Sequence, residues 1–325
     1  MKITLDRVLD AAEEGNADVL KSAAGANASI LGQADGEGYT AALMAALKGH
    51  GDCLEIIVSA APGSLSKACG ALGGAIPAHL AAYNGNLDCL QIIAEKAPAS
   101  LGQSINDGAT SAFIATQNGF PDCLRVVAGA APESLVAQRE ADGATCAYMA
   151  AQKGNEECLR IIAEAAPGTL RTATGAGCVP AFVCAELGHL GCLKIIAETA
   201  ADTLGQASNS GVTPAYMAAQ EGHADCLRLI ALRAGASLAK PSAEGTAPAH
   251  VAAQNGHADC LQVIAEHDPE FIGGEAGFFR TPEVLAAAYE HGRADCVQLI
   301  AERAPGRRCR RKAASLLRKL RKRGS

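Results

Sequence analysis

The stretch EGTAPAHVAAQNGHADCLQVIAEHDP, residues 244–269, carries the pattern on which most of the chain is built. Its first half is small and apolar up to Gly256, which predicts a short helix, helix A, that lets a neighbour approach closely. Gly256 suits the left-handed backbone that ends many helices. After it, Cys260, Leu261 and Ile264 are apolar among polar neighbours at helical spacing, which predicts a second helix, helix B, with one buried face.

The same unit recurs along the chain. The turn glycines are spaced 34 to 36 residues apart and lie at Gly15, Gly49, Gly85, Gly119, Gly154, Gly188, Gly222, Gly256 and Gly292. Four residues after each comes an apolar residue, in order Val19, Cys53, Cys89, Cys123, Cys158, Cys192, Cys226, Cys260 and Cys296. A helix pair of this size cannot bury its apolar face alone. Successive copies are therefore expected to stack into a solenoid with a continuous core.

The unit resembles the ankyrin repeat, which has a period of about 33 residues and a T-P-L-H-x-A signature. The corresponding positions read Thr213-Pro214-Ala215-Tyr216, Ala247-Pro248-Ala249-His250 and Ile76-Pro77-Ala78-His79. Alanine replaces the signature leucine, so the chain is identified as a divergent member. The resemblance covers roughly nine copies, from residue 3 to 305. It implies an all-α, helix-turn-helix solenoid with short loop or hairpin connections, of which 65–74 and 272–281 are expected to be the longest.

The composition fits one ankyrin-like array over residues 1–305, with a capping repeat at 3–34, followed by a basic tail at 306–325. Hydrophobic residues make up 49% of the chain and aromatic residues only 3%, and tryptophan is absent. Such a core packs tightly and offers little for an aromatic-lined ligand pocket. We therefore expect no cofactor and no small-molecule substrate.

The chain has thirteen cysteines, and eight of them occupy one column of the repeat. Stacked helices stand about 8–10 Å apart, whereas a disulfide needs Cα atoms within about 7 Å. The column is therefore interpreted as small buried hydrophobes of a protein in a reducing compartment, cytoplasm or nucleus. No apolar run reaches the length of a membrane-spanning helix, and the N-terminus lacks the apolar core of a secretory signal.

Three groups of residues offer candidate chemistry, and each has a structural alternative. Cys178, Cys184, His189 and Cys192 form a ligand set that zinc accepts, but their places in the repeat favour packing. The histidines that follow a turn glycine are expected to hydrogen-bond locally at the turn, because no nucleophile or carboxylate recurs at a distance suited to a catalytic triad. No phosphate-binding Gly-x-x-x-x-Gly-Lys motif occurs. The sequence therefore predicts no metal site and no enzyme activity.

The tail carries ten basic residues and no acid, namely Arg307, Arg308, Arg310, Arg311, Lys312, Arg318, Lys319, Arg321, Lys322 and Arg323. Residues 1–305 keep 18 basic against 34 acidic residues, a net charge of −16. The tail can form a short basic helix with Leu316, Leu317 and Leu320 on one side. Four roles stay open: a nuclear import signal, an anchor for nucleic acid or anionic lipid, a solubilising end, or a segment that folds back and covers the last repeat.

The resemblance implies a non-enzymatic scaffold that binds another protein through the tips of the connecting fingers and the exposed side of helix A. By repeat register these places are Tyr39, Asn106, Asp107, Gln117, Asn118, Asp142, Gln152, Lys153, Asn209, Ser210, Gln220, Glu221, Glu244, Gln254 and Asn255. Their polar character predicts a hydrogen-bonding surface rather than an apolar groove. The alternative is an electrostatic binder of nucleic acid or another polyanion through the basic tail.

Overall fold

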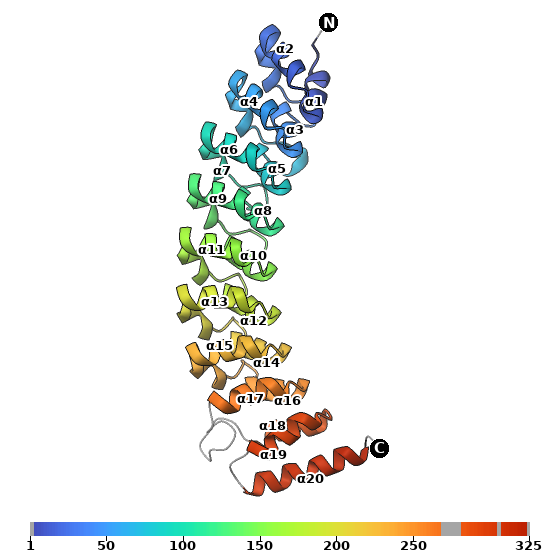
Figure 1. Ribbon diagram of the computed structural model, residues 1–325, viewed down its shortest axis with the longest axis vertical. Helices are drawn as coiled ribbons and strands as arrows, with labels where there is room; N and C mark the ends of the chain where they lie inside the picture. The colour runs from blue at the N-terminus through green and yellow to red at the C-terminus, as the bar shows by residue number, and fades with distance from the viewer. Residues whose placement is uncertain (1–2, 268–280, 304–306, 324–325) are drawn as a thin grey trace. The chain divides into compact units, whose positions relative to one another are not determined.

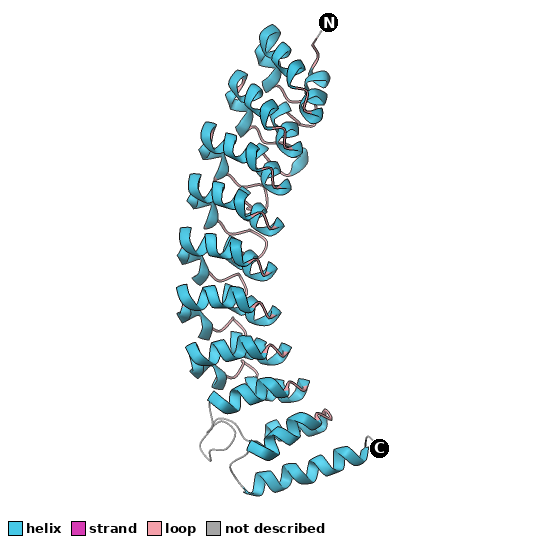
Figure 2. Ribbon diagram, in the orientation of Figure 1, coloured by secondary structure: helices cyan, strands magenta, loops and turns pink. Residues whose placement is uncertain are grey.

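The computed structural model describes residues 3–267, 281–303 and 307–323, with residues 281–282, 307–309 and 323 described by their backbone alone. The chain divides into two compact units, Met1–Thr169 and Leu170–Ser325. Regular structure in the described residues is helical (Figure 2), and β-structure there is limited to three isolated bridges. The expected all-α fold is confirmed.

Unit 1 consists of stacked helix pairs (Figure 1). Helices A of these pairs are α1 (Leu5–Glu14), α3 (Ala41–Lys48), α5 (Pro77–Asn84), α8 (Ser111–Asn118) and α10 (Cys146–Lys153). Helices B are α2 (Ala17–Asn27), α4 (Gly51–Ala60), α6 (Leu87–Lys96), α9 (Pro121–Ala130) and α11 (Glu156–Ala165). Each helix A packs on the next helix A and each helix B on the next helix B, so the unit has two layers.

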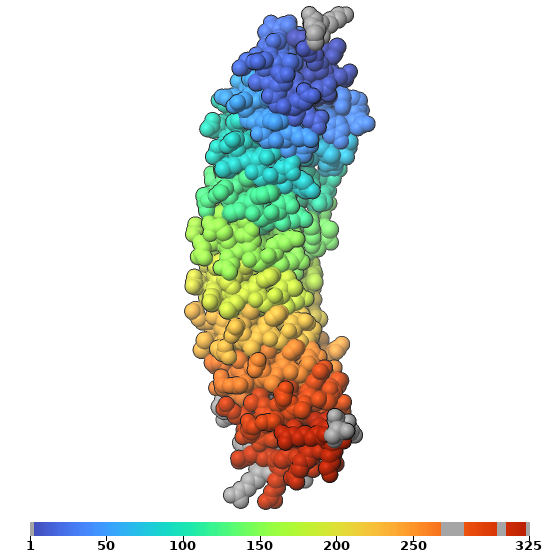
Figure 3. Space-filling model, turned by 45° about the vertical axis from the view of Figure 1, so that its right-hand side comes forward, coloured from blue at the N-terminus to red at the C-terminus, as the bar shows by residue number. Residues whose placement is uncertain are grey.

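Unit 2 repeats this arrangement. Its helices A are α12 (Pro180–Leu187), α14 (Pro214–Glu221), α16 (Pro248–Asn255) and α18 (Thr281–Glu290). Its helices B are α13 (Leu190–Thr199), α15 (Ala224–Ala234), α17 (Ala258–His267) and α19 (Ala294–Arg303). Within each unit, neighbouring repeats pack directly on one another, as one face of the molecule shows in Figure 3.

Local interactions determine where helix A begins and ends. In α3 the Thr40 hydroxyl accepts a hydrogen bond from the Leu43 amide at 3.2 Å, which satisfies a donor that the first turn leaves unpaired. At the other end, Gly49 adopts φ +81°, a left-handed conformation that lets its amide return to the Ala45 carbonyl. The predicted role of the turn glycine is confirmed.

The connection after helix B begins with a short helical turn and continues as a tight hairpin. The turns are Ala28–Gly32, Pro62–Ser66, Pro98–Leu101 (α7), Pro132–Leu135, Pro167–Arg171, Ala201–Gly205 and Gly235–Ala239. A hydroxyl closes several of them, as where Ser100 Oγ donates to the Ala97 carbonyl at 2.7 Å. Isolated bridges such as Ser104–Thr110 then form the base of the hairpin, the finger. The connection at 65–74 holds one further short turn, Gly70–Leu72, and most of 272–281 lies outside the described residues.

The column cysteines are core residues, as predicted. Each of the eight is at most 2% exposed. Burial raises the pKa of the Cys89 thiol to about 12 in unit 1 and that of Cys260 to about 12 in unit 2. These thiols are therefore protonated at neutral pH and act as small hydrophobic side chains.

The C-terminal part of unit 2 departs from the regular repeat. Helix α18 has ten residues where α16 has eight, an extension of about half a turn. Residues Arg307–Arg323 form α20, a helix of seventeen residues that is longer than the predicted one. It packs against α19 and α18, and Ala313 is fully buried in this contact. Of the arrangements considered for the tail, the structure has the one that folds back on the last repeat.

Candidate functional site

At several repeats, the residue that follows the turn glycine ties its repeat to the preceding one. The imidazole Nε2 of His50 lies 2.9 Å from the Glu13 carbonyl, and that of His223 lies 3.0 Å from the Glu186 carbonyl. Asn86 serves the same purpose with its side-chain amide, which donates to the Ala46 carbonyl at 2.7 Å. The prediction that these histidines bond locally at the turn was therefore wrong. They satisfy carbonyls at the C-terminus of the previous helix A, which that helix leaves unpaired.

The same side chains cover the turn glycines. A Cβ placed on Gly222 would lie 2.6 Å from Nδ1 of His257, and one on Gly49 would lie 2.7 Å from Oδ1 of Asn86. Both glycines also have positive φ angles, +85° and +81°. At these two glycines the turn edge is thus closed by the next repeat, and helix A carbonyls there are already engaged within the array.

In unit 1, four of the predicted residues lie at the C-terminal ends of two neighbouring helices A. Gln117 and Asn118 end α8, Gln152 and Lys153 end α10, and all four are exposed. Asn118 donates to the Ile114 carbonyl of its own helix at 3.1 Å. Helices α8 and α10 pack on each other, so these side chains form one continuous polar strip.

The structure brings Asp107 and Asp142 of unit 1 together around Arg139. Arg139 pairs with Asp142 and stands over the Phe113 ring, 5.4 Å from its centroid. The hydrogen bond from Arg139 holds the pKa of Asp142 below its usual range, and the same bond, with a smaller contribution from Asp107, raises the pKa of Arg139. Neighbouring fingers are also joined by backbone, since the Glu140 amide donates to the Asp107 carbonyl at 2.8 Å. The finger tips of unit 1 are therefore held in a defined arrangement.

Two further predicted residues of unit 1 belong to the same hairpin system. The Asn106 amide donates to the Gly73 carbonyl of the preceding finger at 2.9 Å, and the Asn106 side chain is exposed. Tyr39 is half-buried, and its amide donates to Asp35 Oδ1 at 2.8 Å. Both residues therefore present side chains from a fixed backbone.

Sequence reasoning missed one exposed aromatic side chain of this surface. Tyr83 is 59% exposed and occupies on α5 the position that Gln117 occupies on α8 and Gln152 on α10. Repeat register alone would have found it. An exposed tyrosine beside a polar strip is the type of residue that anchors protein interfaces.

The predicted residues of unit 2 form a more acidic surface. Gln220 donates to Glu221 at 2.9 Å on α14, and Asn255 of α16 donates to the Gln220 carbonyl at 2.8 Å. Burial, with Glu221 nearby, raises the pKa of Glu186 on α12. Like charges of neighbouring repeats therefore lie close to one another at this surface.

Other unit 2 residues join this surface to its fingers. Burial raises the pKa of Tyr216, and Glu244 of the following finger raises it further. Asn209 donates to the Gly175 carbonyl at 3.0 Å, and the Ser210 hydroxyl lies 2.9 Å from that of Ser208. Gln254 is half-buried, and its carbonyl accepts from Arg293 Nε at 3.0 Å.

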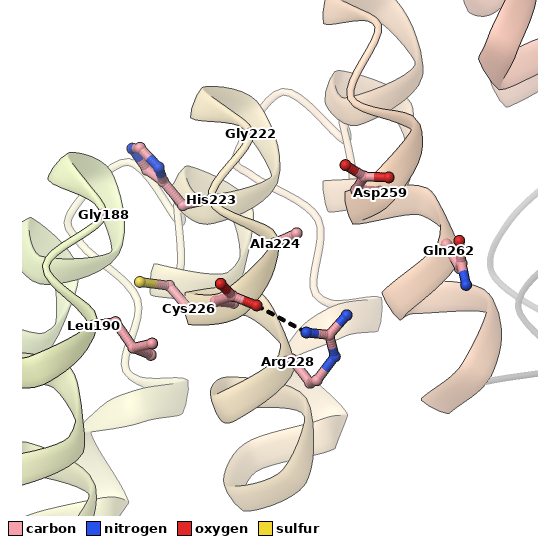
Figure 4. Close-up of a pocket in the computed structure, with 10 residues that line it drawn as sticks. Gly188, Leu190, Gly222, His223, Ala224, Cys226, Arg228, Asp259 and Gln262 are labelled. Atoms are coloured by element: carbon pink, nitrogen blue, oxygen red, sulfur yellow. Dashed lines mark hydrogen bonds and ion pairs between the residues drawn. The ribbon is translucent and has the colours of Figure 1, made fainter.

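A groove of about 420 Å³ follows the turn edge of unit 2 (Figure 4). Its walls include His223 and the ion pair between Asp225 and Arg228, at 2.8 Å, with Asp259 on the next helix B. Burial, then the neighbouring Asp225, raises the pKa of Cys226 to about 11. This thiol is therefore protonated at neutral pH. Because His223 is engaged by the Glu186 carbonyl, the groove presents a structural histidine beside an inert thiol.

The zinc-like set of unit 2 is part of the packing. Cys184 and Cys192 are buried, and Cys178 is half-buried with its amide bonded to the Thr174 hydroxyl at 3.2 Å. Burial and the neighbouring Cys192 raise the pKa of Cys184. Across the described ranges, no group of three or more His, Cys, Asp or Glu side chains is arranged to hold a metal ion. None of the helices described has both the length and the apolar character needed to cross a membrane.

Layers of helix pairs, joined by hairpin fingers, define a helical repeat protein. The sequence model of the family described as ankyrin repeats (3 copies) matches residues 8–103 and 78–172, about half of the chain. The chain belongs to the ankyrin-repeat family. Ankyrin repeats are generally protein–protein interaction modules and typically have no enzymatic activity. A comparison with curated proteins found no similar sequence.

Proposed function

We propose that the array is a scaffold that captures another protein through the finger tips and the exposed ends of helices A. The observation that carries the proposal is that backbone groups and side chains have separate roles at this surface. Backbone carbonyls at the helix A ends are satisfied by the next repeat, as in the contacts of His50 and Asn86, while the side chains of Gln117 and Lys153 remain exposed. Such a surface binds through side-chain identity on a rigid frame.

Within unit 1, Tyr83 supplies the anchor and the α8–α10 strip supplies the surrounding polar contacts. A tyrosine immobilises few rotatable bonds and buries a large area, so it contributes strongly when a partner covers it. The Arg139–Asp142 pair and the bonded finger backbones restrict the finger tips before binding. A restricted surface loses less conformational entropy on association.

The test uses the full chain and a partner captured from native lysate, whose affinity is then measured with purified components. Gln117→Arg combined with Gln152→Arg is expected to weaken binding at least tenfold, because two bulky cations enter the strip. Tyr83→Ala is expected to weaken it about thirtyfold, the loss typical of a central anchor.

The matched control is Gln91→Arg combined with Gln262→Arg. Both glutamines are exposed on helices B, in the other layer. The two control substitutions make the same chemical change as the helix A variant and leave the proposed surface intact. Equal losses in the helix A and helix B variants, with helical content unchanged in both, would contradict the proposed surface.

A second candidate function is electrostatic binding of a polyanion through α20. It is favoured by the exposed cations of this helix, which include Arg311, Lys312, Arg318 and Lys319. Truncation at Pro305 is a poor test, because α20 buries Ala313 against the last repeat and its removal would uncover that repeat. Charge-neutralising substitutions on the outer face of the intact helix avoid this problem.

A further inference from the structure

Helix α20 uses its apolar side to bind its own array. Ala313 is fully buried, and Leu316, Leu317 and Leu320 are half-buried on the same side. At roughly 100° per residue these four positions fall within one face of the helix. The helix packs against α19 and α18, so its apolar face is occupied and its other face determines what it can bind.

The outward face of α20 is almost entirely cationic. Its described residues, apart from Ser315, are arginines and lysines, and all are exposed: Arg311, Lys312, Arg318, Lys319 and Lys322. Two further exposed arginines, Arg310 and Arg321, lie on its flank. At about 100° per residue the exposed cations extend over roughly half of the helix circumference.

We propose that docked α20 binds duplex nucleic acid through the phosphate backbone, without reading the base sequence. This inference rests on the electrostatic candidate function above and names its ligand. An α-helix with side chains is about 10–12 Å across and enters the major groove of a B-form DNA duplex, about 12 Å wide, between two rows of phosphates. Because the cations cover about half of the circumference of α20, they can reach both rows of phosphates. A flat polyanionic surface would contact only a narrow strip of α20.

Two features distinguish a duplex from other polyanions. An interfacial membrane helix inserts its apolar face among the lipid acyl chains, and in α20 that face is buried against α19 and α18. Binding of single strands relies on bases stacked on aromatic side chains, and residues 306–325 contain no aromatic residue. Arginine is more frequent than lysine in this segment, and its side chain pairs with phosphate in a bidentate geometry.

The charge of the rest of the chain confines the contact to α20. Residues 1–305 carry a net charge of −16, against ten basic residues and no acid in 306–325. At physiological ionic strength charges act over about 8 Å, so a duplex that touches α20 is attracted locally and repelled by acidic surfaces elsewhere. A short duplex end or groove segment is therefore the expected footprint.

The test measures binding of a fluorescent duplex of about two helical turns to the full chain at several salt concentrations. With about five phosphate contacts, the slope of log K against log salt is expected to be near −4.5, which is about a 500-fold loss of affinity from 50 to 200 mM. Changing Arg311, Arg318 and Lys319 to Gln together is expected to reduce the slope to about −1.8. Two duplexes of unrelated sequence are expected to bind equally.

The matched control replaces Lys21, Arg160 and Lys194, exposed cations of the repeats, by Gln. It changes the net charge equally and is expected to keep the wild-type slope. Absence of duplex binding, an unchanged slope in the α20 variant, or tighter binding to a single strand or to phosphatidylserine vesicles would each overturn the proposal. Capture of a protein partner through helices A is expected to be unaffected by the α20 variant, so the two functions fail independently.

Discussion

Replacing Gly222 by alanine is expected to destabilise unit 2 by about 2–3 kcal/mol. Gly222 has φ +85°, and an L-residue pays about 1–2 kcal/mol for this left-handed conformation. The new Cβ would also lie 2.6 Å from Nδ1 of His257, so the ring must move. That movement breaks the contact between His257 Nε2 and the Gln220 carbonyl, 3.0 Å long, at a cost of about 1 kcal/mol.

The contribution of the ring can be separated from that of the backbone. Gly292 has φ +70°, and among the described residues no atom beyond its chain neighbours lies within 4 Å of a Cβ placed on it, so Gly292→Ala should show the backbone cost alone. In a double-mutant cycle, Gly222→Ala in a His257→Ala background should lose the ring clash and give a coupling energy of about 1 kcal/mol.

Urea unfolding followed by circular dichroism measures the overall change. Because repeat arrays need not unfold in one step, hydrogen exchange at the amides of α15 and α17 localises it. Equal destabilisation by Gly222→Ala and Gly292→Ala, or strict additivity in the cycle, would refute the idea that the next repeat closes the turn.

The remaining predictions concern the core thiols and the docked tail. Burial raises the pKa of Cys89 and of Cys260 from 9.0 to about 12. Each buried thiol should therefore contribute fully to the free energy of unfolding below pH 9. Above pH 9 this contribution should fall by about 1.4 kcal/mol per pH unit, because only the thiol of the unfolded state ionises there. Urea titrations from pH 7 to 11 check this, and a Cys89→Ala variant should show a shallower decline. Ala313→Glu should place a charge in the contact of α20 with the last repeat and expose the helix. Trypsin should then cleave the tail at least tenfold faster than in Arg311→Gln, and equal rates would contradict the docking.

Helix boundaries could be predicted closely because their signals are local. Thr40 accepts a hydrogen bond three residues ahead, and Gly49 adopts the left-handed conformation whatever lies elsewhere in the chain. The apolar period of helix B identified Cys53 and Leu54 as core residues for the same reason. Each signal acts within one turn of helix, and a single sequence contains all the information needed to read it.

Contacts between repeats were harder to predict. The position of His223 after its turn glycine was visible in the sequence, but its partner, the Glu186 carbonyl, lies 37 residues earlier and is a backbone group with no sequence signature. Tyr83 was missed for a different reason. The list of surface residues favoured polar types, although its register matches that of Gln117.

The tail shows how helix formation depends on packing. From residue pattern alone a short basic helix was expected, with Leu316, Leu317 and Leu320 on one side. The structure extends the helix to seventeen residues, Arg307–Arg323, with Ala313 buried against the last repeat. Burial of one apolar face supplies the stability that intrinsic propensity lacks.

The two units offer surfaces of different chemistry, and salt can separate them. In unit 1 the exposed Tyr83 adjoins a largely neutral strip, so a partner held there binds mainly by burial of apolar area, which added salt does not weaken. In unit 2 Glu186 lies near Glu221 and Glu244 lies near Tyr216, and the attraction of these carboxylates for a basic partner would be screened within a Debye length. A partner whose affinity is unchanged between 50 and 500 mM salt is therefore assigned to unit 1, and Tyr83→Ala must then weaken it. If that substitution is silent while Glu221→Gln weakens binding at every salt concentration, the charge-based distinction between the two surfaces is wrong.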